Sequence, residues 1–157
     1  MDIVLTRDVE ALGTLKRLSA PASATAGGSG DSATTTGVTI DRGGFLPAMP
    51  MSVDAIIAYE AGLQSGKTLS FGYSIQDSPD GSNFSDYQTA TYAVAATGAS
   101  GGSSPAGEFK IAASLTSARR YVRLNFATDL NATGTDTAAA RAVGFFAGFS
   151  RNPAPTS

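Results

Sequence analysis

The stretch FGYSIQDSPDGSNFSDYQTATYAV, residues 71–94, decides the fold class. In its first part apolar and polar residues alternate, and this period of two is typical of a β-strand with one buried face. The alternation returns in residues 86–94, and Pro79-Asp80-Gly81 between them forms a turn, since Pro presets φ and Gly accepts a positive φ. We therefore predict an antiparallel β-hairpin. The buried face of its first strand is Leu69, Phe71, Tyr73 and Ile75.

The acidic residues of the turn raise the question of a metal or catalytic site. Calcium loops place oxygen ligands at alternate positions, whereas Asp77, Asp80 and Asn83 are three apart and Pro79 stands where a ligand is needed. A carboxylate pair for glycoside hydrolysis needs one acid with a raised pKa, and we expect Asp77, Asp80 and Asp86 to lie in a solvated turn that raises none. The turn is thus interpreted as a hairpin corner.

Five other segments show the same alternation. They are residues 38–41, 52–63, 109–115, 121–126 and 141–149, the last of which places Val143, Phe145, Ala147 and Phe149 on one face. About seven strands with Gly- and Pro-rich connections predict an all-β fold, an antiparallel β-sandwich or jelly roll. We expect this domain to span residues 34–150 and to be followed by a C-terminal tail at 151–157.

Residues 1–33 differ from the rest in pattern. Val9, Leu12, Leu15 and Leu18 have a helix-like spacing, so the first twenty residues are expected to form an extended or short-helical arm. The segment PASATAGGSGDSATTTG, residues 21–37, consists of small and polar residues and predicts a flexible linker or surface loop. Residues 1–33 are accordingly assigned to an arm and its linker.

Composition removes several function classes. The chain of 157 residues has no Cys and no His, which excludes disulfides, thiolate or imidazole metal ligands and the usual Ser-His and Cys-His nucleophile pairs. With 11 basic and 13 acidic groups, it offers no field to attract a polyanion or an anionic membrane. We therefore expect no enzyme activity, cofactor, metal, nucleic acid or membrane partner.

One local charge concentration stands out, Arg119-Arg120-Tyr121-Val122-Arg123. An aromatic residue among arginines is compatible with a nucleic-acid or carbohydrate contact. The alternation of Tyr121 and Arg123 with Val122 favours instead the outward face of a strand. We predict that Arg119, Arg120 and Arg123 pair with acidic groups of a neighbouring subunit.

The order of these features resembles a known family. A TGVTIDRGG strand, the hairpin SFGYSIQDSPDGSNFSDY and a late SARRYVRLNF before a Thr/Gly/Asp/Ala-rich loop are similar to the small head cement, or decoration, proteins of tailed bacteriophages. The resemblance runs from about residue 34 to 149. The Ser/Gly/Ala-rich loops at 21–37 and 96–107 are longer than the turns expected in that family.

The resemblance implies a structural virion protein, made in the host cytoplasm, that sits on the outer surface of an icosahedral head. There it clamps neighbouring copies of the major capsid protein and forms a homo-oligomer, a dimer or a trimer. An apolar N-terminal segment on a flexible tether is a natural contact that orders on binding. Its candidate contact residues are Ile3, Val4, Leu5, Val9, Leu12 and Leu15.

Two alternatives stay open. One is a structural subunit of a phage tail or of the head–tail joint. A carbohydrate-binding β-sandwich module is compatible with the five Tyr residues, although such sites favour aromatic platforms and the chain has no Trp.

Overall fold

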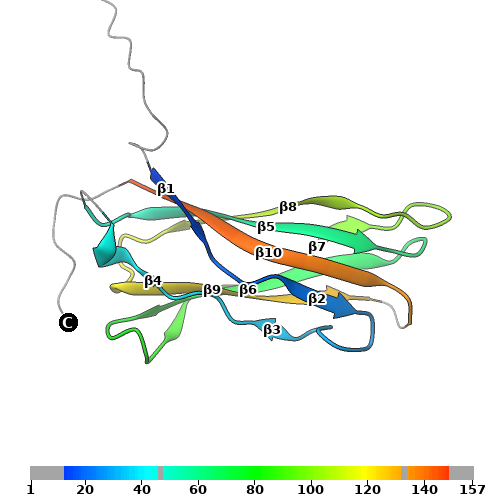
Figure 1. Cartoon of the computed structure of the whole chain (residues 1–157), viewed down its shortest axis with the longest axis horizontal. Helices are drawn as coiled ribbons and strands as arrows, with labels where there is room; N and C mark the ends of the chain where they lie inside the picture. The colour runs from blue at the N-terminus through cyan, green and yellow to red at the C-terminus, as the bar shows by residue number, and fades with distance from the viewer. Residues whose placement is uncertain (1–12, 46–47, 132–133, 149–157) are drawn as a thin grey trace, which may run out of the picture.

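The computed structural model describes residues 13–45, 48–131 and 134–148, and these form two antiparallel sheets packed face to face (Figure 1). In sheet A the order of strands is β1-β10-β5-β8, and β2 pairs with β10 beside β1. Its strands are β1 (Gly13–Arg17), β2 (Ala22–Thr25), β5 (Ser52–Gly62), β8 (Ala106–Ser114) and β10 (Thr137–Ala147).

Sheet B has the order β3-β9-β6-β7, and β4 pairs with β9 beside β3. A short 3-10 helix, η1 (Arg42–Gly44), follows β4. The strands of this sheet are β3 (Thr34–Thr35), β4 (Ile40–Asp41), β6 (Thr68–Ser78), β7 (Ser85–Thr97) and β9 (Tyr121–Leu130).

The connections between these strands define a jelly roll. β1 and β2 follow one another along one edge of β10, and β3 and β4 do the same along β9, so each pair acts as one interrupted edge strand. From β2 onward, the β3–β4 connection and the β6–β7 hairpin each stay within sheet B. Every other connection between consecutive strands crosses from one sheet to the other. Two sheets joined in this way have jelly-roll connectivity. The predicted fold class is confirmed.

The core lies between the sheets, where the predicted alternation is observed. Along β5 every second side chain from Val53 to Ala61 is buried. Phe71 of β6 is fully buried at the centre, with ring centroids 5.7 Å from Tyr59, 5.6 Å from Phe109 and 6.1 Å from Phe126. Tilted and edge-to-face aromatic pairs of this kind stabilise a core beyond their buried area.

The buried face of β10 is opposite to the one that its larger residues indicate. Phe146 and the alanines before it point inward, whereas Val143 and Phe145 are only partly buried on the outer face. The reason is Gly144, because a Cβ atom there would lie 2.6 Å from Leu18 Cδ1. The missing side chain makes room for Leu18 in the core.

The described part of the N-terminal region is extended, which fits one of the two predicted forms of the arm but not the short helix, and part of the predicted flexible linker is a strand. Residues 13–17 form strand β1, and residues 22–25, expected in the flexible linker, form β2, both paired with β10. Pairing with an open strand edge outweighs helix spacing in a segment this short. Gly13 also fits the strand, because a Cβ there would lie 2.4 Å from Phe145 Cζ, so the ring covers the glycine.

The seven strands predicted from the sequence correspond to β4–β10. The hairpin turn is also as predicted: Gly81 has φ +76°, and the Asp80 carboxylate accepts hydrogen bonds from the backbone N–H groups of Ser82 and Asn83, both at 2.8 Å. These bonds hold the pKa of Asp80 well below its usual range.

Candidate interaction surfaces

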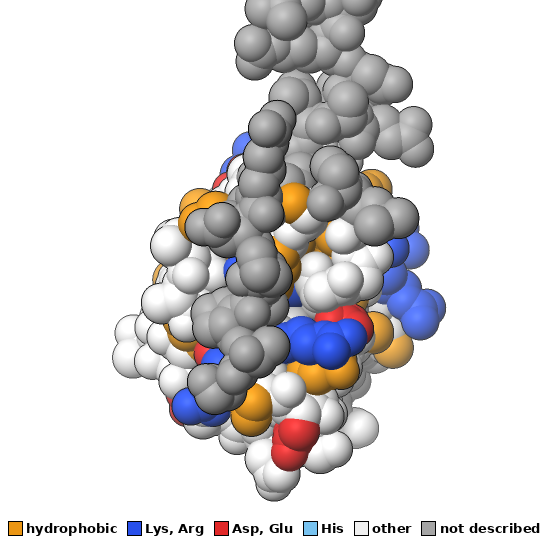
Figure 2. Space-filling model, turned by 90° about the vertical axis from the view of Figure 1, so that its left-hand side faces the viewer, with side chains coloured by type: hydrophobic (Ala, Val, Ile, Leu, Met, Phe, Trp, Pro, Cys, Tyr) orange, Lys and Arg blue, Asp and Glu red, His pale blue; other side chains and the backbone are white. Residues whose placement is uncertain are grey.

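The predicted arginine cluster lies at one end of the sandwich, which we call the arginine end and define by Asp41, Asp77, Arg119, Arg120 and Arg123. Figure 2 looks onto this end, where basic side chains lie beside acidic and hydrophobic ones. It is built by β4, the β6–β7 hairpin and the start of β9.

Arg120 pairs with Asp41 within the chain. Its Nε and Nη2 donate to the two carboxylate oxygens of Asp41 at 2.9 and 2.8 Å, a bidentate contact. This bond lowers the pKa of the Asp41 carboxyl and raises that of Arg120. The Arg120 guanidinium also lies 5.1 Å from the Tyr121 ring centroid.

The other two arginines of the cluster also have partners inside the chain. Arg119 donates its backbone N–H to Asp77 Oδ2 at 2.9 Å, and its Nη1 lies 3.7 Å from Asp77 Oδ1. Arg123 donates from Nε to Gln76 Oε1 at 2.8 Å and lies 4.0 Å from the Phe84 ring centroid. Pairing of these arginines with another subunit therefore stays a prediction, and any such contact has to compete with these bonds.

Asp77 corrects the expectation of a fully solvated turn. It is 6% exposed, because it lies at the end of β6 where the Arg119 backbone closes over it. The described residues contain no group of three or more acidic, Cys or His side chains placed to hold a metal ion.

Arg42 is a structurally important residue that sequence reasoning missed. It is 2% exposed, and its guanidinium donates to the backbone carbonyls of Pro50, Leu115, Ala118 and Arg119. Burial lowers its pKa from the usual value for arginine. A charged residue before two glycines normally indicates a solvated turn, so no local signal pointed to a buried role.

The outer face of sheet A carries an apolar patch near the start of the described chain. Leu15 is 67% exposed and lies opposite Phe145 in the β1–β10 register. Two residues along the same face, Val143 of β10 lies opposite Ile56 of β5. Directly opposed residues on one face contact one another. We call Leu15, Ile56, Val143 and Phe145 the sheet A patch.

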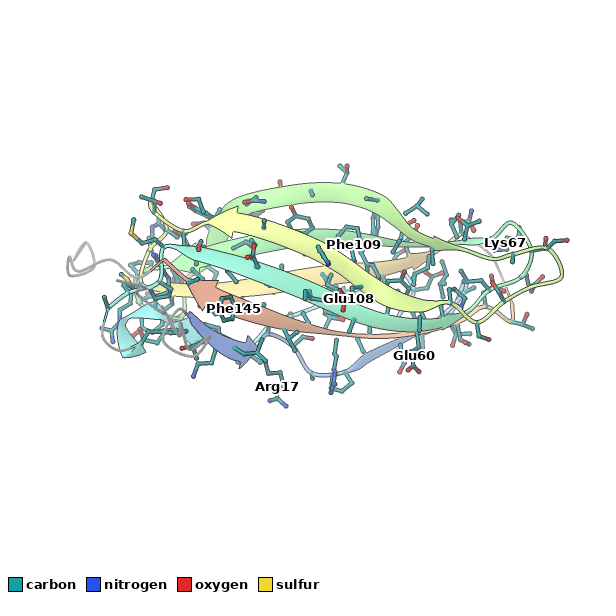
Figure 3. The ribbon with its side chains drawn as sticks, turned by 90° about the horizontal axis from the view of Figure 1, so that it is seen from above. Arg17, Glu60, Lys67, Glu108, Phe109 and Phe145 are labelled. Carbon is teal, nitrogen blue, oxygen red and sulfur yellow. The ribbon has the colours of Figure 1, made fainter. Side chains whose placement is uncertain are left out.

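Charged residues surround this patch on the same face. Asp54 lies opposite Phe145, Arg17 opposite Val143, and Lys110 opposite Ile56. Figure 3 looks down on sheet A and shows Arg17 and Phe145 near one end, with Glu60 and Glu108 farther along the face. An apolar centre within a charged rim is a common arrangement at protein–protein contacts.

The outer face of sheet B has a shallow groove of about 300 Å³ between β6, β7 and β9. Tyr92, 47% exposed, forms one wall, with its ring against Gly72. The rest of the lining is mixed, with polar Ser74, Thr91 and Asn125 beside apolar residues such as Ala90 and Ala127. An exposed aromatic ring beside hydroxyl and amide groups is a combination that suits a small polar ligand such as a sugar.

Of the predicted contact residues, four are described. Leu15 belongs to the sheet A patch, and Arg119, Arg120 and Arg123 belong to the arginine end, so the structure places them on two separate surfaces. The others lie outside the described residues: Ile3, Val4, Leu5, Val9 and Leu12. No helix in the described part of the chain is long and apolar enough to cross a membrane.

No protein-family model matches the sequence, and no curated protein matches it. Among solved structures, the chain is similar to the structure of the infectious bursal disease virus Gt strain, with 14% identity, a TM-score of 0.41 and coverage of 92% of this chain and 35% of that chain. It is similar to the infectious bursal disease virus VP2 subviral particle with 11% identity, a TM-score of 0.45 and coverage of 90% and 34%. The chain thus spans about a third of the matched chains. At this level of similarity the matches say nothing about what the chain does.

Proposed function

We propose that this chain is a structural virion protein of a tailed bacteriophage that decorates the outer surface of the icosahedral head. In this role it acts without catalysis, forms a homo-oligomer and clamps neighbouring copies of the major capsid protein. The support from sequence is the order of motifs shared with head cement proteins. The support from structure is a jelly roll, an architecture that viral capsid domains use, although a fold alone does not define a function.

The observation that carries the proposal is the sheet A patch. A decoration protein needs complementary area on a rigid body, because its affinity comes from several weak contacts made at once. Leu15 is exposed and Phe145 is half-buried, and both offer apolar area on paired strands, which do not have to order on binding. The apolar residues Ile3 to Leu12 precede this patch in sequence, so the patch and the N-terminal segment form one candidate capsid contact.

Binding to purified heads that lack the protein tests this assignment. We expect Leu15→Asp to lower occupancy on heads about tenfold or more, because a charge in the centre of an apolar contact has to be desolvated. Val38→Asp is the matched control, since Val38 is also an exposed aliphatic residue but lies outside the patch. Removal of residues 1–12 should also lower occupancy. Equal occupancy for all four proteins would contradict the proposed contact.

The same particles distinguish decoration from a tail or head–tail joining role. A cryo-EM map of wild-type particles should show the protein over the whole head surface. Density confined to the tail, or to the one vertex where the tail attaches, would replace decoration with a joining role.

A carbohydrate-binding module remains the second candidate, and the Tyr92 groove is the observation that favours it. A glycan array with the wild-type chain tests it. Tyr92→Ala is the matched variant, because stacking of a sugar depends on the aromatic ring. Binding to a glycan that is lost in Tyr92→Ala would establish this function. The decoration proposal expects no glycan signal above background.

A further inference from the structure

Two long strands end the sheets on the same side of the sandwich. β7 is the last strand of sheet B and β8 is the last strand of sheet A, and each pairs with one neighbour among the described residues. Figure 3 shows β7 beyond β8 at this side of the molecule. Outside its pairing with β6, the backbone of β7 receives a bond from one described side chain, the Tyr59 hydroxyl at Ala95. Among the described residues, no other strand pairs with the outer edge of β7, so this edge can accept another strand.

β7 lacks most of the devices that prevent strand edges from pairing. It is long, and residues 87–97 contain no charged residue and no proline. Natural sheets usually protect an edge with short strands, lysines, prolines or bulges. β7 has only the last of these, because its pairing with β6 shifts register at three places. Between two of the shifts, Ala93 and Val94 pair regularly with Phe71 and Ser70.

We propose that β7 pairs antiparallel with β7 of a second copy of this chain, about a two-fold axis at Ala93. This register sets Tyr92 of each copy opposite Val94 of the other, on the outer face of sheet B. Tyr92 and Val94 are 47% and 60% exposed in the single chain, and aromatic–β-branched pairs are favourable across strands. The paired region contains no charge, so the symmetric arrangement opposes no like charges.

The position of β8 relative to β7 follows from two tyrosines. Tyr59, which lies opposite Gly107 of β8, donates to the Ala95 carbonyl of β7 at 2.9 Å. Tyr87 of β7 donates to the Ser114 carbonyl of β8 at 2.8 Å. The two strands therefore run past each other in opposite directions, with Ala95 near Gly107 and Tyr87 near Ser114.

An axis through Ala93 consequently crosses β8 close to Phe109. Glu108 and Lys110 stand on either side of Phe109 in the sequence of β8; both are exposed, and Lys110 Nζ lies 3.7 Å from Glu108 Oε2 within the chain. A two-fold axis between them sets Glu108 of each copy near Lys110 of the other. The sheet B edge thus contributes strand pairing, and the sheet A edge contributes two opposite-charge contacts. This charge complementarity is what selects a second copy over an unrelated strand.

The inference specifies the homo-oligomer included in the proposed function, but it does not depend on head binding. Its test is the mass of the purified full-length chain in solution, by analytical ultracentrifugation. We expect a dimer, with twice the mass of the 15.8 kDa chain. Val94→Lys introduces on the outer edge the residue that natural sheets often use to prevent strands from pairing, and it should reduce the mass to that of one chain. Ala139→Lys, at an exposed position on β10 two strands away from β8, should remain a dimer.

Cysteine cross-linking tests the position of the axis, and the chain has no cysteine of its own. In the proposed register Ala93 of one copy lies opposite Ala93 of the other, and the expected separation of their Cα atoms suits a disulfide. Under mild oxidation Ala93→Cys should form covalent dimers rapidly, whereas Ala139→Cys should not. Equal rates for the two variants would overturn the register.

A charge exchange tests the β8 contact. Glu108→Lys or Lys110→Glu alone should raise the dimer dissociation constant about tenfold, since two like-charge contacts replace two favourable ones. The double exchange should restore the wild-type value to within about threefold. A wild-type monomer or trimer, a dimer that survives Val94→Lys, or no change in the single charge variants would each overturn the proposal. Head occupancy is measured separately, so failure here leaves the decoration proposal to its own experiment.

Discussion

The two long sides of the sandwich end their sheets in different ways. On one side, which we call the closed side, the edges are the short strands β1–β4, and a backbone bond from Val38 N–H to the Leu18 carbonyl, 2.7 Å, connects the two edges. On the other, the open side, the edges are β7 and β8. The sheets are connected there by the hydroxyl groups of Tyr59 and Tyr87.

The two sides differ in whether the backbones of the two sheets bond directly to one another, and small residues account for the direct bonding on the closed side. On the closed side, Ala24 and Ala26 are buried, and Asp31 accepts bonds from the N–H groups of Gly27 and Leu130 at 2.7 and 2.9 Å. Small side chains let the backbone come close enough to bond directly. On the open side the connection is made through long side chains, which leaves the strand backbones accessible.

We expect the greatest loss of stability from a change at Arg42, which follows β4 of the closed side and bonds to the segment after β8 of the open side. Arg42→Met leaves the carbonyls of Pro50, Leu115 and Ala118 without their buried donor. We expect a loss of about 3–5 kcal/mol in the free energy of unfolding, since several buried acceptors become unsatisfied. Urea denaturation followed by circular dichroism measures it.

Arg141→Met is the control for this prediction, because Arg141 is exposed on the outer face of sheet A. Its free energy of unfolding should stay within about 0.5 kcal/mol of wild type. A similar small effect for Arg42→Met would mean that these carbonyls find other donors.

The next prediction tests whether the close approach of two backbone segments on the closed side contributes to stability. A Cβ atom at Gly37 would lie 2.0 Å from the Leu124 carbonyl oxygen, and Gly37 N–H donates to Asn125 Oδ1 at 3.0 Å. Gly37→Ala should therefore cost roughly 1–3 kcal/mol by forcing β9 and the 36–39 segment apart. Gly44→Ala has nothing within 4 Å of the new atom and should change stability by less than about 0.5 kcal/mol. Equal losses of stability in Gly37→Ala and Gly44→Ala would show that β9 and the 36–39 segment can move apart without cost.

A smaller effect is expected on the open side. Tyr59→Phe removes the hydroxyl that bonds to the Ala95 carbonyl and keeps the ring in the core. The expected loss is about 1 kcal/mol, the usual net contribution of one hydrogen bond. Tyr92→Phe is the control, because none of the described residues bonds to its hydroxyl. Hydrogen exchange should increase along β7 in Tyr59→Phe alone, and unchanged exchange would mean that Tyr59 does not hold this edge.

The sequence predicts most of the strands, but not the contacts that distinguish the closed side from the open side. The alternation in β5 and β6 was clear, because one face is large and apolar and the other is polar. In the second half of β10, residues 142–147, both faces are apolar, so size favoured Val143 and Phe145, whereas the glycine at position 144 leaves space for Leu18 on the other face. β1 has a helix-like spacing that pairing with β10 overrides. The bonds of Arg42 and Asp77 join segments far apart in the chain, and no local pattern indicates such contacts.

The smallest expected effect concerns the ion pair between Asp41 and Arg120 at the end of the closed side. Because Arg120 lowers the pKa of Asp41 in the folded protein, the stabilisation is present above the unfolded pKa, about 4, and is lost as the pH falls through the lower folded value. The Asp41 side chain is 36% exposed, so solvent screening keeps the contribution below about 1 kcal/mol. Between about pH 7 and pH 2.5, Asp41→Asn should therefore lose less unfolding free energy than wild type. All other acidic residues are the same in the two proteins, so the difference isolates Asp41. An equal loss in the two proteins would show that the pair contributes nothing to holding the closed side.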